Sequence, residues 1–153
     1  RGHIINIGSI AGDAAYPGAY AVILLRPQGY PCVFYGDYYG LDAREGRNIQ
    51  PVIDIMLKLR HECLYGIQRD YFDDSSIVGW TMEGDGEHKN CGLVVIMTDK
   101  TGGTKTMNVG AVHKGEVWKD ALGNCKAEVT IDEDGNGEFF CEDGSCSVYI
   151  KKL

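Results

Sequence analysis

The segments Ile77-Val78-Gly79-Trp80 and Gly92-Leu93-Val94-Val95-Ile96-Met97 decide the fold of the C-terminal part of this chain. Each is short and apolar, and comparable apolar or alternating segments continue toward the C-terminus at residues 104–109, 117–118, 127–131, 137–141 and 146–150. Glycine, aspartate and asparagine separate them about every eight to twelve residues, which is typical of an antiparallel β-sandwich or barrel. We therefore predict a mainly β chain in which residues 66–153 form an antiparallel Greek-key β-sandwich.

The residues before Gly66 have the pattern of mixed α/β structure. Residues 3–8 (HIINIG) and 31–35 (PCVFY) indicate short buried strands, residues 19–25 indicate a helix, and the strongest helix begins at Pro51. We expect the two strands to pair in parallel, with the first helix as their crossover. So small a remnant leaves an apolar face exposed, and we expect it either to dimerise or to dock on the sandwich.

Charge and hydropathy exclude two classes of partner. The chain has 153 residues, a net charge of −7 and no cluster of lysine and arginine, so nucleic acids and anionic membranes are not expected to bind. Its longest apolar run, residues 19–25, is too short to span a bilayer.

The six cysteines show no metal-binding spacing. A two-residue turn at Asp143-Gly144 would place Cys141 opposite Cys146 across a hairpin. A disulfide and a pair of small apolar side chains both fit that arrangement. Cytoplasmic and secreted locations therefore both stay open.

From about Ala19 onward, the chain resembles the liquefying-type bacterial α-amylases of the starch-cleaving glycoside hydrolases. The most specific stretch is Gly29-Tyr-Pro-Cys-Val-Phe-Tyr-Gly-Asp-Tyr-Tyr-Gly40, and Leu64-Tyr-Gly-Ile-Gln-Arg-Asp-Tyr-Phe-Asp73 and Gly115-Glu-Val-Trp-Lys-Asp120 support it. The resemblance implies that residues 19–65 are a remnant of a (β/α)8 TIM barrel, its last strand and helix. It implies that residues 66–153 are the β-sandwich domain behind the barrel.

The same resemblance implies that this chain holds none of the family's catalytic carboxylates, which follow barrel strands four, five and seven. Retaining hydrolysis needs two carboxyl groups about 5–5.5 Å apart, and Asp37 in the stretch FYGD matches a position whose role looks structural. We expect an amylase fragment without activity of its own. Two alternatives are weak α-glucan binding, through the sandwich or through the loop with Tyr38 and Tyr39, and glycosidase activity from a site assembled in an oligomer.

The family also implies a calcium site between barrel and sandwich. Asp99 matches its carboxylate ligand, Ser75 matches a carbonyl ligand, and Ser76 replaces a ligand aspartate, so calcium binding should be greatly weakened. Residues 132–137 resemble the start of an EF-hand loop, but the strands expected on both sides favour a turn.

Residues 2–18 (GHIINIGSIAGDAAYPG) resemble a different family, the short-chain dehydrogenases/reductases. Ser9 matches that family's catalytic serine and Tyr20 lies near its tyrosine, but Leu24 stands where the lysine is required. The resemblance implies that Ser9 is vestigial and that the chain is a chimera, with residues 1–18 of different origin. Trp80 and Trp118 fall within strand patterns and are expected in the core, and the histidines are expected in surface or packing roles.

Overall fold

The computed structural model describes residues 16–40 and 49–153. Three helices come first, then the strands, with one short 3-10 helix among them: α1 (Tyr16–Leu24), α2 (Tyr35–Tyr39), α3 (Gln50–Cys63), β1 (Gln68–Tyr71), β2 (Val78–Met82), β3 (Leu93–Met97), β4 (Gly103–Asn108), η1 (Ala111–His113), β5 (Val117–Asp120), β6 (Val129–Thr130), β7 (Asn136–Cys141) and β8 (Cys146–Lys151). None of the helices in these ranges has the length and apolar character that a membrane span requires.

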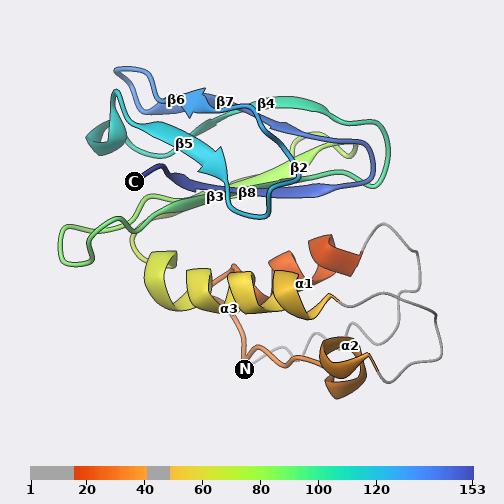
Figure 1. Cartoon of the computed structure of the whole chain (residues 1–153). Helices are drawn as coiled ribbons and strands as arrows, with labels where there is room; N and C mark the ends of the chain where they lie inside the picture. The colour runs from red at the N-terminus through yellow and green to blue at the C-terminus, as the bar shows by residue number, and fades with distance from the viewer. Residues whose placement is uncertain (1–15, 41–48) are drawn as a thin grey trace.

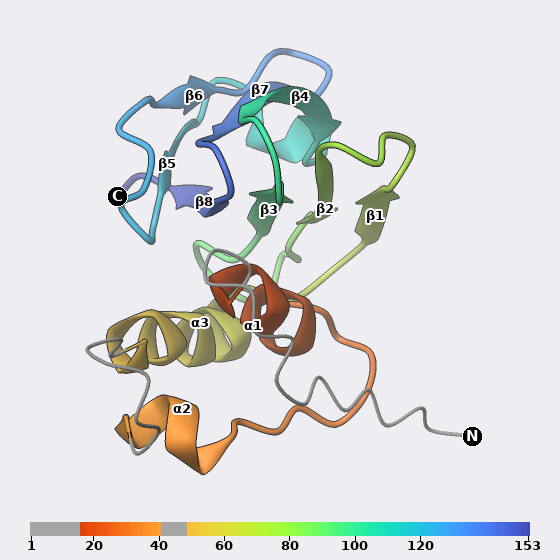
Figure 2. The same ribbon diagram turned by 90° about the vertical axis from the view of Figure 1, so that its right-hand side faces the viewer.

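The strands form two sheets. A six-stranded antiparallel sheet has the order β1-β2-β3-β8-β5-β6, and β4 pairs with β7 in a second, two-stranded sheet. The last strand, β8, returns to lie between β3 and β5, as a Greek-key connection requires. The helices cover one face of the larger sheet and the β4–β7 pair covers the other (Figures 1 and 2). The predicted mainly β sandwich is confirmed.

Strand β3 lies at the centre of these layers. Leu93 and Val95 contact the helices, whereas Val94 and Ile96 contact the β4–β7 side, and all four are fully buried. A strand that is covered on both faces is apolar throughout rather than alternating. This explains the uninterrupted run in residues 92–97 that indicated the fold.

The helix layer docks on the sandwich through one apolar cluster. Leu24 and Leu25 at the end of α1, and Met56 of α3, are fully buried together with Trp80 and Val148 of the sheet. Docking on the sandwich is therefore confirmed for the helix predicted at residues 19–25, whereas residues 3–8 lie outside the described residues. Dimerisation stays a prediction.

Hydrogen bonds also hold this interface, because the last carbonyl groups of a helix have no partner within the helix. Arg60 of α3 donates to the Leu24 carbonyl at 2.7 Å and to the Arg26 carbonyl at 2.9 Å. The Trp80 Nε1 donates to the Leu25 carbonyl at 2.8 Å. The end of α1 is thus fixed by both α3 and the sheet.

The strand predicted at residues 31–35 is wrong. Residues 31–34 have no regular structure, and Tyr35 begins the short helix α2. A parallel strand requires a hydrogen-bonded neighbour, and none of the described strands pairs with this segment. The proposed partner, residues 3–8, lies outside the described residues. The helix predicted at 19–25 and the long helix from Pro51 are both confirmed, as α1 and α3.

The hairpin predicted around Asp143-Gly144 is also wrong. The turn exists, but it carries the chain from one sheet to the other, because β7 pairs with β4 whereas β8 pairs with β3 and β5. Cys141 is opposite Gly103 and Cys146 is opposite Met97. Both side chains are buried free thiols, and burial raises the pKa of each. The role of small apolar side chains fits them, and a disulfide does not.

The docked helix layer predicts a clear stability difference within it. Leu24→Ala should lower the free energy of unfolding by about 2–4 kcal/mol, because it leaves a cavity between α1 and the sheet. Leu57→Ala is the matched control, since Leu57 is 40% exposed on the outer side of α3, and it should cost less than about 1 kcal/mol. Urea titration followed by tryptophan fluorescence measures both. Equal small losses would contradict docking of the helix layer.

Candidate functional site

The predicted carbohydrate-binding tyrosines lie on α2. This helix has only five residues and ends at Gly40, whose φ of 68° is a conformation that suits glycine and whose backbone N–H bonds the Gly36 carbonyl. It packs against α3 on the side of the helix layer that faces away from the sheet (Figures 1 and 2). The site is therefore remote from the sandwich core.

The rings of the two predicted residues, Tyr38 and Tyr39, are in contact, with centroids 4.9 Å apart, but the residues differ in exposure and bonding. Tyr38 turns toward α3, where its hydroxyl donates to Asp54 Oδ1 at 2.7 Å, and this bond raises the pKa of Tyr38. Tyr39 stays 58% exposed, and its ring centroid lies 4.5 Å from that of Tyr35, which is 63% exposed. Tyr38 is thus an anchor, and Tyr35 joins Tyr39 at the surface.

Sequence reasoning missed Tyr35 because it assigned residues 31–35 to a strand. In a helix, residues four apart lie on one face, so the pair Tyr35 and Tyr39 follows from the spacing once the segment is helical. Asp37, expected to be structural, accepts a hydrogen bond from the Tyr20 hydroxyl at 2.6 Å. That bond ties α2 to α1, and sugar binding by Tyr38 and Tyr39 stays a prediction.

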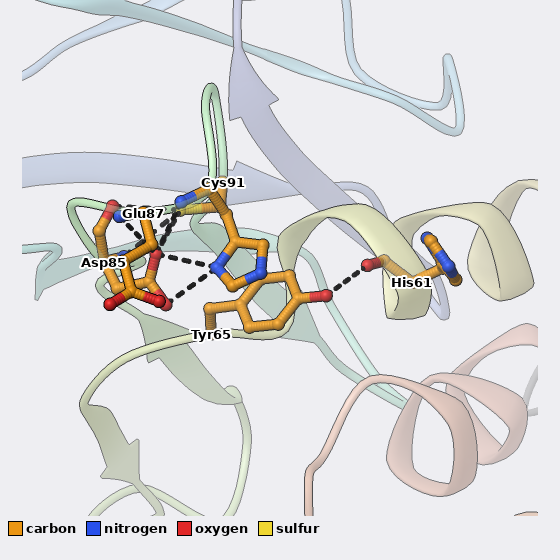
Figure 3. A network of polar contacts seen from close by, with 6 residues as sticks. His61, Tyr65, Asp85, Glu87 and Cys91 are labelled. Atoms are coloured by element: carbon orange, nitrogen blue, oxygen red, sulfur yellow. Dashed lines mark hydrogen bonds and ion pairs between the residues drawn. The ribbon is translucent and has the colours of Figure 1, made fainter.

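A second polar network lies where α3 meets the loop between β2 and β3 (Figure 3). The rings of Tyr65 and His88 stack with centroids 3.6 Å apart and planes 5° apart, and His88 Nδ1 lies 2.9 Å from each carboxylate oxygen of Asp85. Cys91 Sγ accepts a hydrogen bond from the Asp85 backbone N–H at 3.1 Å, and the Tyr65 hydroxyl donates to the His61 carbonyl at 2.8 Å. The loop is thereby fixed against the end of α3.

The backbone supports the same joint. Gly84 N–H donates to the Tyr65 carbonyl at 2.8 Å, and Gly92 N–H donates to the Cys63 carbonyl at 3.1 Å. Gly66 has a φ of 79°, and a Cβ there would lie 1.8 Å from the Gly84 carbonyl oxygen, so only glycine fits. This cluster holds structure together, and within residues 16–40 and 49–153 no three His, Cys, Asp or Glu residues are placed to hold a metal ion.

The residues matched to a calcium site lie on neighbouring loops. Ser75 and Asp99 are both exposed, and the hydroxyl of Thr98 joins the loops by donating to the Ser76 carbonyl at 2.6 Å. Calcium needs six to eight oxygen ligands, and the described residues here offer one matched carboxylate. The donor set does not make a complete site, and the expectation of greatly weakened calcium binding stays a prediction.

The acidic segment at residues 132–137 is a turn between strands, as its flanking pattern predicted. Asp132 Oδ1 accepts the backbone N–H groups of Asp134 at 2.9 Å and Asn136 at 2.8 Å. The bond from Asn136 is the main reason why the pKa of Asp132 is lowered. The carboxylate of Asp132 therefore stabilises the turn.

Carboxyl groups in the described structure serve mainly as partners for cations and backbone N–H groups. Burial raises the pKa of Glu116, but hydrogen bonds from Lys151, His113 and Trp118 outweigh it and lower that pKa overall. All the carboxyl groups with a resolved change have a lowered pKa: Asp70, Asp73, Asp85, Glu116 and Asp132. A general acid for glycoside cleavage needs the opposite, a raised pKa.

The remaining predicted residues fall into two groups. Trp80 and Trp118 are fully buried, so the prediction that they belong to the core is confirmed. Of the histidines, His61 is exposed, whereas His88 and His113 pair with carboxylates. Ser9 lies outside the described residues, so its vestigial role stays a prediction.

Comparison with known families and proteins matches the sandwich to one family. Residues 93–150 match the family described as "Alpha-amylase C-terminal". The chain is 47% identical over 136 residues to a glucan 1,4-alpha-maltohexaosidase of Bacillus sp. (strain 707), with 89% of this chain and 26% of that protein covered. It is 48% identical over 136 residues to an alpha-amylase of Geobacillus stearothermophilus, with 89% and 25% covered.

A more distant relative is a cytoplasmic alpha-amylase of Escherichia coli (strain K12), which is 35% identical over 144 residues, with 88% of this chain and 29% of that protein covered. The chain thus spans about a quarter of the length of these relatives. Among solved structures, an alpha-amylase from Malbranchea cinnamomea has a TM-score of 0.64 at 14% identity, with 90% of this chain and 33% of that chain covered. A gamma-CGTase from alkalophilic Bacillus clarkii has a TM-score of 0.63 at 16% identity, with 93% and 24% covered. At 14% and 16% sequence identity, these two solved structures show similarity of fold and nothing more.

The contacts of Glu116 predict a pH dependence of stability. Because the pKa of Glu116 is lowered in the folded state, its contribution is complete above the unfolded value of about 4.3 and is lost as pH falls through the folded value. Glu116→Gln should therefore lower the free energy of unfolding by roughly 1–3 kcal/mol at pH 7, and by much less near pH 3.

Urea titration at both pH values measures this difference. Glu128→Gln is the matched control, because the pair of Glu128 with Lys152 is 44% and 46% exposed and should contribute less than about 1 kcal/mol. A loss for Glu116→Gln that is the same at pH 7 and pH 3 would contradict the assignment.

Proposed function

The chain contains a domain homologous to the C-terminal domain of bacterial α-amylases, and from that premise we propose that it is the non-catalytic C-terminal part of an α-amylase polypeptide. The observation that carries this proposal is the docking of α1 and α3 on the sandwich through the buried cluster around Leu24, Met56 and Trp80. The similarity to the relatives covers 89% of the chain, which is more than the sandwich alone. Helix layer and sandwich therefore act as one structural unit.

The chemistry of the described residues supports a non-catalytic role. Retaining hydrolysis requires one carboxylate that attacks and another carboxyl group that stays protonated at working pH. Asp70 instead pairs with Arg26 at 2.8 Å, and Asp73 pairs with Lys105 at 2.8 Å. Asp37, the carboxylate of the most specific family stretch, is bonded to Tyr20. These groups support the fold, and we infer that they do not cleave α-glucans.

A starch assay tests this proposal. The purified chain, incubated with soluble starch from low to high micromolar concentration, should release no reducing ends above a buffer control. The range of concentrations also tests the alternative in which an oligomer assembles an active site. Activity that Asp37→Asn abolishes and Asp74→Asn leaves intact would contradict the proposal, because Asp74 is an exposed surface carboxylate.

α-Glucan binding at the surface of α2 is the competing function. Exposed tyrosine rings can stack on sugar rings, but sugar hydroxyls also require hydrogen-bonding groups. Two neighbouring carboxylates already accept hydrogen bonds within the chain, Asp54 from Tyr38 and Asp37 from Tyr20. We therefore place this function second. Isothermal calorimetry with maltoheptaose should show no saturable heat. Saturable binding that is lost in the Tyr39→Ala variant would make α-glucan binding the preferred function.

We also propose that residues 1–18 have a separate, dehydrogenase-like origin and no oxidoreductase activity. The similarity to the α-amylase relatives leaves about a tenth of the chain uncovered, a length comparable with that of this segment. The sequence departs from the dehydrogenase pattern at Leu24, where a lysine is needed.

A further inference from the structure

His113 lies between two groups that can only accept a hydrogen bond. Its ring nitrogen Nε2 lies 2.5 Å from the backbone carbonyl oxygen of Glu83, and Nδ1 lies 2.9 Å from Glu116 Oε2. A carbonyl oxygen carries no proton. The Glu116 carboxyl group carries none at neutral pH, because its hydrogen bonds outweigh burial and lower its pKa. Each ring nitrogen of His113 therefore has to donate the proton of its own hydrogen bond.

A neutral imidazole ring does not satisfy both contacts. It has a proton on one nitrogen and a lone pair on the other, so either the Glu83 carbonyl or the Glu116 carboxylate would face a lone pair at hydrogen-bonding distance. His113 is only 8% exposed, so water has little access to replace the missing donor. Leaving a buried acceptor without its donor is costly, most of all for a charged group.

We propose that His113 is protonated on both ring nitrogens and acts as a pH-sensitive clamp on the connection between the two sheets, which is released when the ring loses one proton. Its helix η1 follows β4 of the two-stranded sheet and precedes β5 of the six-stranded sheet. Glu83 directly follows β2, and Glu116 directly precedes β5. The ring thus ties η1 to the ends of two strands of the larger sheet.

The charged groups around the clamp are paired with one another, and Glu116 is the anion that bonds the ring. Lys151 of β8 donates to Glu116 Oε1 at 2.7 Å, and the Glu83 carboxylate pairs with Arg69 of β1. Burial disfavours a charged ring, whereas an anion in direct contact favours it. The two acceptors decide the balance, because only the doubly protonated ring satisfies both.

Two other elements lie close to η1. The Trp118 ring of β5 meets the His113 ring in a T-shaped contact, with centroids 5.2 Å apart. The turn before β7 approaches through Gly135, where an added Cβ would lie 2.5 Å from the Ala111 backbone nitrogen. The charged side chains of that turn and of the residue after η1 are exposed: Asp132, Glu133, Asp134 and Lys114. Water and salt screen such exposed charges, so Glu116 dominates the field at the ring.

NMR of the nitrogen-15-labelled chain reads the protonation of each ring directly. At pH 7, both ring nitrogens of His113 should have the chemical shift of a protonated nitrogen, and the loss of these signals in His113→Gln assigns them. His61 is the reference within the same chain because it is exposed, and its ring should lose a proton at a lower pH than the ring of His113. A His113 ring with one protonated and one bare nitrogen at pH 7 overturns the proposal.

Amide hydrogen exchange tests the release of the clamp. The Glu116 N–H donates to the His113 carbonyl at 3.0 Å, and the Gly115 N–H donates to the Ile131 carbonyl at 2.8 Å. A folded chain that holds an extra proton loses stability as pH rises. Raising the pH until the ring signals change should therefore lower the protection of these two amides, corrected for the intrinsic exchange rate, about ten-fold or more.

The variants separate the charge from the side chain's shape. His113→Gln keeps one donor without the charge and should show the low protection already at pH 7. His61→Gln is the matched control and should behave like the parent chain. Protection that follows neither the protonation of His113 nor its replacement overturns the clamp.

Discussion

The six-stranded sheet must be covered on both faces, and the rest of the structure depends on that constraint. Its central strand carries Leu93, Val94, Val95 and Ile96 without a polar residue between them, and all four are fully buried. The β4–β7 pair covers one face and the helix layer covers the other. Without the helices, Trp80, Met82 and Val148 would meet water, at a cost of about 25 cal/mol for each Å² of apolar surface. The helix layer is thus part of the sandwich's own core.

Polar contacts decide where the helices lie on this apolar surface. An apolar contact has no direction, whereas a hydrogen bond does. Trp80 can only donate, and the carbonyl of Leu25 at the end of α1 lacks a helical partner, so their bond at 2.8 Å satisfies both groups. The stack of Tyr65 on His88 holds the residues after α3 to the loop between β2 and β3. These two sets of contacts therefore fix the position of the helix layer, whose remaining contact with the sheet is apolar.

Much of the fold follows from local pattern, and its exceptions have a common cause. The strands of the sandwich, α1 and α3 could be predicted because apolar spacing and turn residues lie within each segment. The segment 31–35 could not, because an apolar run becomes a strand only where a neighbour pairs with it. The hairpin predicted between Cys141 and Cys146 was wrong for a related reason, because the residues of a tight turn do not reveal that its two strands enter different sheets. The polar strand β1 was not predicted, because its residues Gln68–Tyr71 gain order from pairing with β2. At the candidate site, Tyr39 could be named from the sequence as a candidate surface residue. Tyr35 could not, because it lies beside Tyr39 only when the segment is helical.

Several carboxyl groups of the described residues lie beside cations, and this position governs their chemistry. A catalytic acid must keep its proton near neutral pH, which requires an apolar or anionic environment that raises its pKa. Burial raises the pKa of Asp70 and of Glu116, but their hydrogen bonds, including those from Arg26 and Lys151, outweigh it. A hydrogen bond from Lys105 lowers the pKa of Asp73. The same pairing that stabilises the fold thus lowers pKa values that a catalytic acid would need raised. The surroundings of these three carboxyl groups lower the pKa of each, and they favour structural roles.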